Sequence, residues 1–151
     1  MTTRARCTLR KTKRNERLRT FPVWEMEFGT LPDVMAGIAT RKVKWDRVYQ
    51  KKHGIRTAAA QSLPDGMEGY LDKLSKRIYR ALSLSGYARI DFRMRPDGSV
   101  FVLEANANPN LSHAEDFAQS VKATGMDYGE LLGRIMRLGM NYQSPWRLQD
   151  V

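Results

Sequence analysis

Two acidic side chains and an amide in the second half of the chain have the types and spacing of a cation site. Asp91 lies in an alternating stretch, residues 87–94, and Glu104 ends a second stretch, residues 100–104, with Asn106 two residues further on. Carboxylate and amide oxygens are the hard ligands that Mg²⁺ prefers, and Mg²⁺ takes its remaining ligands from water and substrate phosphates. These three residues are therefore a candidate magnesium–nucleotide site, with Mn²⁺ as the alternative ion.

A β-hairpin is the element that would bring these residues together. The two stretches are separated by Pro96-Asp97-Gly98-Ser99, which is typical of a tight turn. Pairing of the strands places Asp91 near Glu104, and Arg89, two residues before Asp91, then lies on the same sheet face. Each residue also has an ordinary interpretation: Asp91 pairs with a neighbouring arginine, Glu104 is exposed at a strand end, and Asn106 shapes a loop.

The order of these residues along the chain resembles the signature of the D-alanine–D-alanine ligase-like branch of the ATP-grasp enzymes. In that signature an R-x-D strand precedes an L-E-x-N-x-x-P strand and loop, and here Arg89-Ile90-Asp91 precedes Leu103-Glu104-Ala105-Asn106-Ala107-Asn108-Pro109. The resemblance covers roughly residues 15–142. It implies that Arg89 contacts the transferring phosphoryl group, and that magnesium ions are held against the ATP phosphates by Asp91, Glu104 and Asn106.

Two further segments acquire roles from the same resemblance. The loop after the second strand would hold the incoming substrate and turn backbone N–H groups toward a developing oxyanion. The residues concerned are Asn108, Asn110, Leu111 and Ser112. The alternative is that this segment is an ordinary Asn/Pro turn. The segment from Ala39 to Asp46 is similar to the lysine-bearing loop that covers the nucleotide. Lys44 is therefore expected at the phosphates as a catalytic residue beside Arg89, with Lys42 as the alternative lysine.

The function implied by the resemblance is ATP- and Mg-dependent joining of a carboxylate to an amine through an acyl phosphate, with ATP as co-substrate. Phosphoryl transfer is catalysed mainly by positioning and by cations placed where charge develops, which suits this set of residues. Where the family places the acceptor's carboxylate, Glu115 would repel such a group, which favours a small carboxylate or amine substrate outside cell-wall synthesis. The chain is expected to be a truncated fragment with little activity alone, so its partners would include the missing ATP-grasp half or a second copy.

Composition sets wider limits on the function. A chain of 151 residues, 42% of them hydrophobic, is long enough for one core, and its single cysteine excludes an internal disulfide framework. No apolar run approaches the length of a membrane span, and the cytoplasm is the default location. Residues 1–20 hold eight Lys and Arg against Glu16 alone, so +7 of the net charge of +10 lies there. A basic segment of this kind is typically solvated and disordered. The alternative functions for the chain are a nucleic-acid-binding domain and a non-catalytic scaffold.

The expected fold is an α+β domain equal to the C-terminal ATP-grasp subdomain, with an antiparallel sheet and helices packed on one face. Three segments are expected: a basic, disordered or non-native segment 1–14, the partial ATP-grasp domain 15–142, and a tail 143–151. Apolar periodicity predicts a strand over 21–28 and helices over 64–85, 114–123 and 128–140. Ser62 or Asp65 would cap the N-terminus of the first helix, and Asp127 that of the last. Residues 41–56 show neither a helical nor a strand period of apolar residues and are predicted to be a loop.

Overall fold

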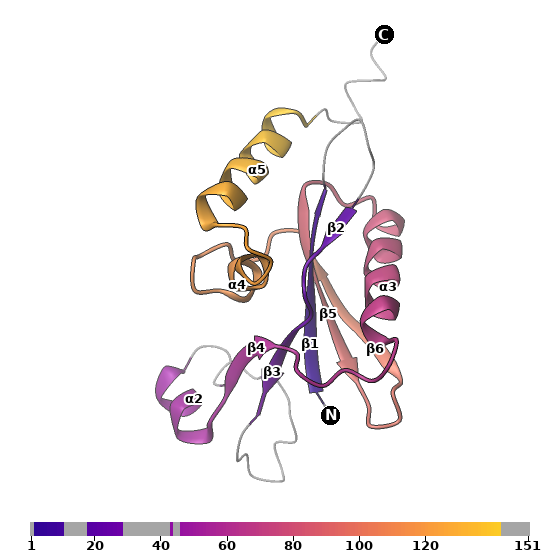
Figure 1. The fold of residues 1–151 in the computed structure, drawn as a ribbon, viewed down its shortest axis with the longest axis vertical. Helices are drawn as coiled ribbons and strands as arrows, with labels where there is room; N and C mark the ends of the chain where they lie inside the picture. Colours follow the sequence, from indigo (N-terminus) through magenta and orange to yellow (C-terminus); the bar gives the residue numbers. More distant parts are fainter. Residues whose placement is uncertain (1, 11–17, 29–42, 44–45, 143–151) are drawn as a thin grey trace.

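Every strand pairing in the described part of the sheet is antiparallel. The computed structural model describes residues 2–10, 18–28, 43 and 46–142. The strand order is β4-β3-β1-β5-β6, and β2 also pairs with β1. The strands are β1 (Thr2–Arg10), β2 (Leu18–Thr20), β3 (Trp24–Glu27), β4 (Arg56–Ala59), β5 (Tyr87–Met94) and β6 (Val100–Asn106). The helices are α2 (Arg47–His53), α3 (Met67–Ala81), α4 (Asp116–Lys122) and α5 (Tyr128–Met140) (Figure 1).

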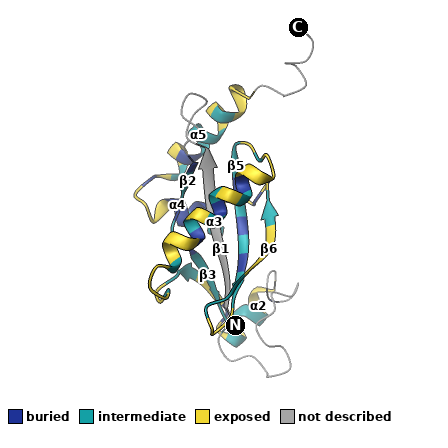
Figure 2. Ribbon diagram, turned by 90° about the vertical axis from the view of Figure 1, so that its right-hand side faces the viewer, coloured by how far each residue is buried: buried dark blue, intermediate teal, exposed yellow. Residues whose placement is uncertain are grey.

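Helix α3 covers one face of the sheet because β5 directs its apolar residues there. Ala88, Ile90 and Phe92 alternate along the strand and are buried, as expected of a strand with one core face. Ile90 and Phe92 pack with Leu71 of α3, and Ala88 packs with its Tyr79. The outward side of α3 is exposed (Figure 2). Tyr87, Arg89, Asp91 and Arg93, which alternate with these residues along β5, therefore lie on the opposite face.

Helices α4 and α5 lie on that opposite side, at one end of the sheet (Figure 1). Their core is built on Phe117, whose ring meets Phe21 at 6.2 Å and Tyr87 of β5 at 5.7 Å, both edge-on. Val121 and Leu131 complete this buried cluster. The predicted α+β class with an antiparallel sheet is thus confirmed, while helices lie on both sides of the sheet and not on one face alone.

The hairpin and the last helix follow the sequence-based predictions. Strands β5 and β6 flank the predicted turn, and α5 begins at Tyr128 with Asp127 as its N-cap, where the carboxylate accepts the Glu130 N–H at 2.9 Å. Helix α3 is shorter than predicted. Its N-cap is Gly66, which has a positive φ of 74° and makes no side-chain cap bond, so neither predicted residue caps it.

The prediction of a loop over residues 41–56 is wrong for its described part. Helix α2 begins after Asp46, whose carboxylate accepts the Tyr49 N–H at 2.9 Å, and ends at Gly54, which has the left-handed conformation with φ of 62°. Lys51, Lys52 and His53 lie in its last turn, where cations interact favourably with the helix dipole. Caps and dipole together stabilise a short helix that has no apolar period, and β4 follows it.

The N-terminal segment is not disordered over its described part. Strand β1 lies between β3 and β5, with Thr2 opposite Met94 and Leu9 opposite Tyr87, so its backbone is hydrogen-bonded within the sheet. Tertiary pairing therefore overrides the basic composition that suggested a solvated arm. Whether this segment is native to the family stays a prediction. Residues 11–14 and the predicted tail lie outside the described residues.

Across the described chain, no helix has the length and apolarity needed to traverse a lipid bilayer.

Candidate functional site

The predicted acidic pair is brought together by the β5–β6 ladder. Asp91 lies directly opposite Glu104, and Arg89 lies directly opposite Asn106. Residues that face each other across an antiparallel pair project from the same side of the sheet, with Cβ atoms about 4.5–5.5 Å apart. The four predicted residues of the hairpin therefore form one cluster, on the face not covered by α3.

A register shift in the hairpin places Glu104 in this cluster. Phe92 is paired with Val102 and Asp91 with Glu104, so Leu103 is an extra residue in β6 with no partner in β5. An unshifted ladder would place Leu103 opposite Asp91 and turn Glu104 toward the α3 face. Such bulges re-aim side chains next to functional sites. Here the bulge brings the second carboxylate to the first.

Arg89 holds Asp91 in a two-pronged ion pair. Its Nε donates to Oδ1 at 2.8 Å and its terminal Nη2 donates to Oδ2 at 3.0 Å, and the two side chains are only 20% and 14% exposed. Partial burial and the forked geometry make this a stronger contact than an exposed surface pair. The ordinary interpretation of Asp91 as an ion-pair partner is therefore realised in this structure, while Glu104 is exposed.

Asn106 and the loop after it form successive tight turns. The Asn106 side-chain oxygen accepts the Asn108 N–H at 2.8 Å, and the Asn108 side-chain oxygen accepts the Tyr87 hydroxyl at 3.0 Å. Pro109 is buried. Further along, Asn110 accepts both the N–H of Ser112 at 3.0 Å and its hydroxyl at 2.8 Å. The predicted substrate loop is thus an ordered turn whose Ser112 N–H is already donated within the loop.

Helices α4 and α5 hold the far end of this loop. The Tyr128 hydroxyl donates to the Leu111 carbonyl at 3.0 Å, and the Gln119 amide donates to the His113 carbonyl at 2.7 Å. The Tyr128 ring also meets the His113 ring edge-on at 5.1 Å. No pattern in the sequence indicates Tyr87, Gln119 or Tyr128 as residues of the site, because their contacts with the loop depend on tertiary packing.

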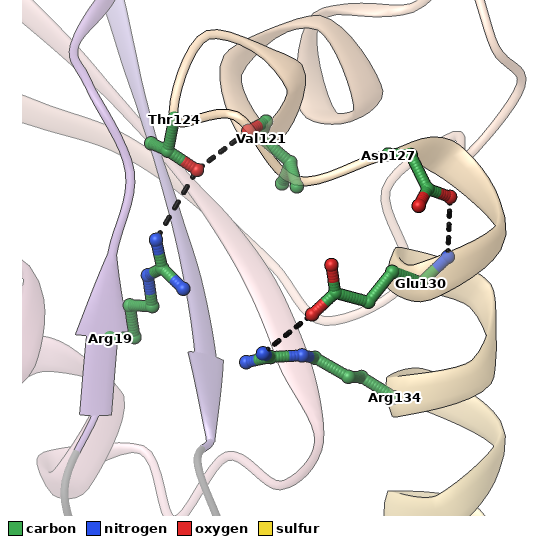
Figure 3. A network of polar contacts seen from close by, with 6 residues as sticks. All are labelled: Arg19, Val121, Thr124, Asp127, Glu130 and Arg134. Atoms are coloured by element: carbon green, nitrogen blue, oxygen red, sulfur yellow. Dashed lines mark hydrogen bonds and ion pairs between the residues drawn. The ribbon is translucent and has the colours of Figure 1, made fainter.

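One polar contact in Figure 3 links the α4–α5 pair to the sheet, and the others lie within the pair. Arg19 of β2 donates to the Thr124 hydroxyl at 3.3 Å, and that hydroxyl donates to the Val121 carbonyl at 2.7 Å. Within α5, Arg134 pairs with Glu130 at 2.7 Å. The Arg19 contact thus adds one exposed hydrogen bond between β2 and the end of α4, beside the apolar packing around Phe117.

The chemistry of the cluster fits a hard divalent cation. Its donors are two carboxylates and one amide oxygen from neighbouring strands, which suits an ion that completes its shell with water and phosphate. In the described residues no three His, Cys, Asp or Glu side chains gather as a metal-binding group, so the protein would supply only part of a coordination shell. Lys44 and Lys42, the predicted phosphate contacts, lie outside the described residues.

Comparison with known proteins gives one consistent family. The sequence profile described as "D-ala D-ala ligase C-terminus" matches residues 34–137. The D-alanine–D-alanine ligase of Desulfovibrio desulfuricans is 33% identical over 95 residues, which are 61% of this chain and 31% of that protein. D-alanine–D-alanine ligase A of Pseudomonas putida is 27% identical over 132 residues, 83% of this chain and 37% of that protein. The chain thus spans about a third of the length of these relatives.

Solved structures of the same kind share the fold. A D-alanine–D-alanine ligase from Bacillus anthracis, complexed with ATP, aligns with a TM-score of 0.66 at 20% identity, covering 92% of this chain and 38% of that one. A D-Ala:D-Ser ligase from Enterococcus faecalis aligns with a TM-score of 0.65 at 18% identity, covering 91% of this chain and 36% of that one. At such identities the likeness establishes the fold.

Proposed function

Because this chain belongs to the family of D-ala D-ala ligase C-terminal domains, we propose that it is the metal- and phosphate-binding part of an ATP- and Mg-dependent carboxylate–amine ligase. The observation that supports this most directly is the placement of Asp91 opposite Glu104, on one sheet face with Arg89 and Asn106. Since the chain spans about a third of its relatives, complete turnover is assigned to the whole ligase. For this chain alone we propose weak Mg·ATP binding.

In the proposed reaction, a carboxylate oxygen of the first substrate attacks the γ-phosphorus of ATP and ADP leaves. The amine of the second substrate then attacks the acyl carbon, phosphate leaves, and the amine nitrogen loses a proton to solvent. Bound Mg²⁺ would neutralise charge on the phosphates. Asp91, Glu104 and Asn106 would hold the ion, and Arg89 would donate to the oxygens of the phosphoryl group. Lys44, or alternatively Lys42, would contact the phosphates from the lysine-bearing loop.

The loop from Asn108 to Ser112 would position the substrate. Its order is supported by the hydrogen bonds from Tyr87 and Tyr128, which leave the loop in place before a ligand arrives. The Ser112 N–H is donated to Asn110, so we propose the N–H groups of Asn110 and Leu111 as the donors to a developing oxyanion. The partners would be ATP, a small carboxylate and a small amine, together with the rest of the ATP-grasp domain or a second copy, in the cytoplasm.

Isothermal titration calorimetry with ATP and Mg²⁺ tests the proposal. Glu104→Gln keeps the shape of the side chain but removes a ligand charge, so it should weaken Mg·ATP binding by about tenfold or more, which corresponds to about 1.4 kcal/mol. Glu68→Gln is the matched control because it lies in the first turn of α3, which packs on the opposite face of the sheet. Absence of binding heat in the unmodified chain, or equal affinities of all three proteins, would reject the proposed site.

A further inference from the structure

We propose that Arg89 changes partner when ligands bind: it neutralises Asp91 in the free protein and passes to the nucleotide's phosphates when a divalent cation takes that carboxylate. This inference rests on the proposed function and concerns the order in which its ligands are accepted. It predicts that the ligand-free site resists a lone cation and accepts a cation readily only together with a polyphosphate.

The geometry of the pair supports the first half of this exchange. Arg89 engages both oxygens of Asp91, through Nε at 2.8 Å and Nη2 at 3.0 Å. A cation bound to the same carboxylate would lie within a few ångströms of the guanidinium, where like charges repel strongly in a partly buried setting. Because an arginine stays protonated, it cannot relieve this repulsion by losing a proton. The ion pair therefore opposes a lone metal ion at Asp91 and should loosen when one binds.

The surroundings support the second half. Arg89 is 20% exposed, so its guanidinium stays partly buried when the contact with Asp91 loosens, and a phosphate anion there would stabilise its charge. Its forked donors match a phosphate as well as they match a carboxylate. A cation that arrives with phosphate supplies both the replacement ligand for Asp91 and the new partner for Arg89. Cation and nucleotide should therefore each raise the affinity of the site for the other, as thermodynamic linkage requires.

The test measures Mn²⁺ alone and Mn²⁺ with ATP as separate titrations. Free Mn²⁺ is followed by electron paramagnetic resonance for the unmodified chain, Arg89→Met, Arg89→Lys and Arg93→Met. Arg89→Met should bind Mn²⁺ alone about tenfold more tightly and Mn·ATP about tenfold more weakly, each being about 1.4 kcal/mol. Arg89→Lys keeps the charge but loses the fork, and should shift Mn²⁺ affinity in the same direction by a smaller factor.

Arg93→Met separates partner exchange from a general charge effect, because Arg93 is two residues along β5 on the same face and opposite Phe101. It removes the same charge from a position opposite Phe101 and not from the ion pair with Asp91, so it should tighten Mn²⁺ binding by a clearly smaller factor than Arg89→Met does. Equal tightening in both methionine variants, or unchanged or undetectable Mn²⁺ binding in Arg89→Met, overturns the exchange. Thermal melts confirm that each variant is folded, and Arg89→Lys remains informative where Arg89→Met is not.

The two proposals fail in different ways. Tighter Mn²⁺ binding in Arg89→Met, with no Mn·ATP binding in any protein, would support the competition for Asp91 and reject the nucleotide site. Mn·ATP binding that depends on Glu104, with no effect of Arg89→Met or Arg89→Lys on Mn²⁺ alone, would leave the proposed function in place and overturn the exchange.

Discussion

Asp91 and Glu104 are cross-strand partners, and their position on one sheet face depends on the register shift beside them. The β6 strand contains Leu103 as an extra residue between the partners of Asp91 and Phe92. If β6 paired with β5 without this register shift, Glu104 would point toward the hydrophobic layer under α3. An unpaired carboxylate is strongly disfavoured there. The bulge therefore keeps the core apolar and supplies the second acidic group of the candidate site.

If Asp91 and Glu104 bind the same magnesium site, their contributions to Mg·ATP affinity should be coupled. Asp91→Asn and Glu104→Gln should each weaken Mg·ATP binding by about tenfold or more, and the double variant should lose less than the sum of the two effects. A coupling free energy of about 1 kcal/mol or more, measured by calorimetry on the four proteins, is expected. Strict additivity would mean that the two side chains act at separate places.

The loop prediction concerns Tyr128, which holds the Leu111 carbonyl. Tyr128→Phe keeps the edge-on contact with His113 but removes the donor, at a cost of about 0.5–1.5 kcal/mol for one hydrogen bond. Amide hydrogen exchange in the loop should become faster by up to about tenfold, while exchange in the hairpin stays the same. Tyr142→Phe is the control because Tyr142 is 56% exposed. Unchanged exchange in the loop would show that Tyr128 does not order it.

Local patterns predicted those parts of the fold that local physics determines. The hairpin has its alternation and its turn within a few residues, and α5 has both an apolar stripe and a capping Asp127. Helix α2 also has local signals, the capping residues Asp46 and Gly54, but the prediction of a loop was based on the absence of an apolar period alone. Cap residues were informative there and periodicity was not.

The remaining features depend on tertiary contacts. Strand β1 is basic in sequence yet lies inside the sheet, because neighbours on both sides satisfy its backbone. The Tyr128 contact with Leu111 joins residues seventeen positions apart, and the Arg19 contact with Thr124 joins residues 105 positions apart. The bulge at Leu103 cannot be read from alternation, which assigns Glu104 to the wrong face. The motif indicated the residues of the candidate site, but it did not indicate the contacts that hold them in place.

The core between α3 and β5 allows a matched stability test. Leu71 is 1% exposed and packs on Ile90 and Phe92, whereas Leu82 at the C-cap of the same helix is 54% exposed. Leu71→Ala should lower the free energy of unfolding by about 2–5 kcal/mol, since it removes buried methyl groups and leaves a cavity. Leu82→Ala should change it by less than about 1 kcal/mol. Chemical denaturation measures both, and similar losses would contradict the packing described.

The hairpin turn has a pH dependence that follows from Asp97. The Ser99 hydroxyl and N–H donate to its carboxylate at 2.6 and 2.9 Å, and these bonds lower the pKa of Asp97 below its ordinary 3.8. A lowered pKa means that the contribution to stability is present above pH 3.8 and is lost as the pH falls through the lower value. An NMR titration of Asp97 should show this, and Ser99→Ala should raise the pKa toward the ordinary value. An unchanged titration in Ser99→Ala would contradict the assigned cause.

The exposed cations of α2 distinguish the ligase from a nucleic-acid-binding protein. Arg47, Lys51 and Lys52 are exposed on this helix, so some attraction for a polyanion is expected. Phosphate contacts of this kind weaken steeply with salt because bound counterions are released. Fluorescence anisotropy with a labelled oligonucleotide should therefore show binding at about 50 mM salt that is largely lost at about 200 mM, and that Glu104→Gln does not change.

The same titrations with all three α2 cations changed to Gln complete the comparison. Under the ligase proposal, this variant loses oligonucleotide binding but keeps Mg·ATP affinity within about threefold, because the proposed metal ligands lie on β5 and β6. Under the alternative, oligonucleotide binding would persist at physiological salt with a submicromolar dissociation constant, and Mg·ATP binding would be absent. That second result would assign the basic surface, and not the carboxylate pair, as the functional part of the chain.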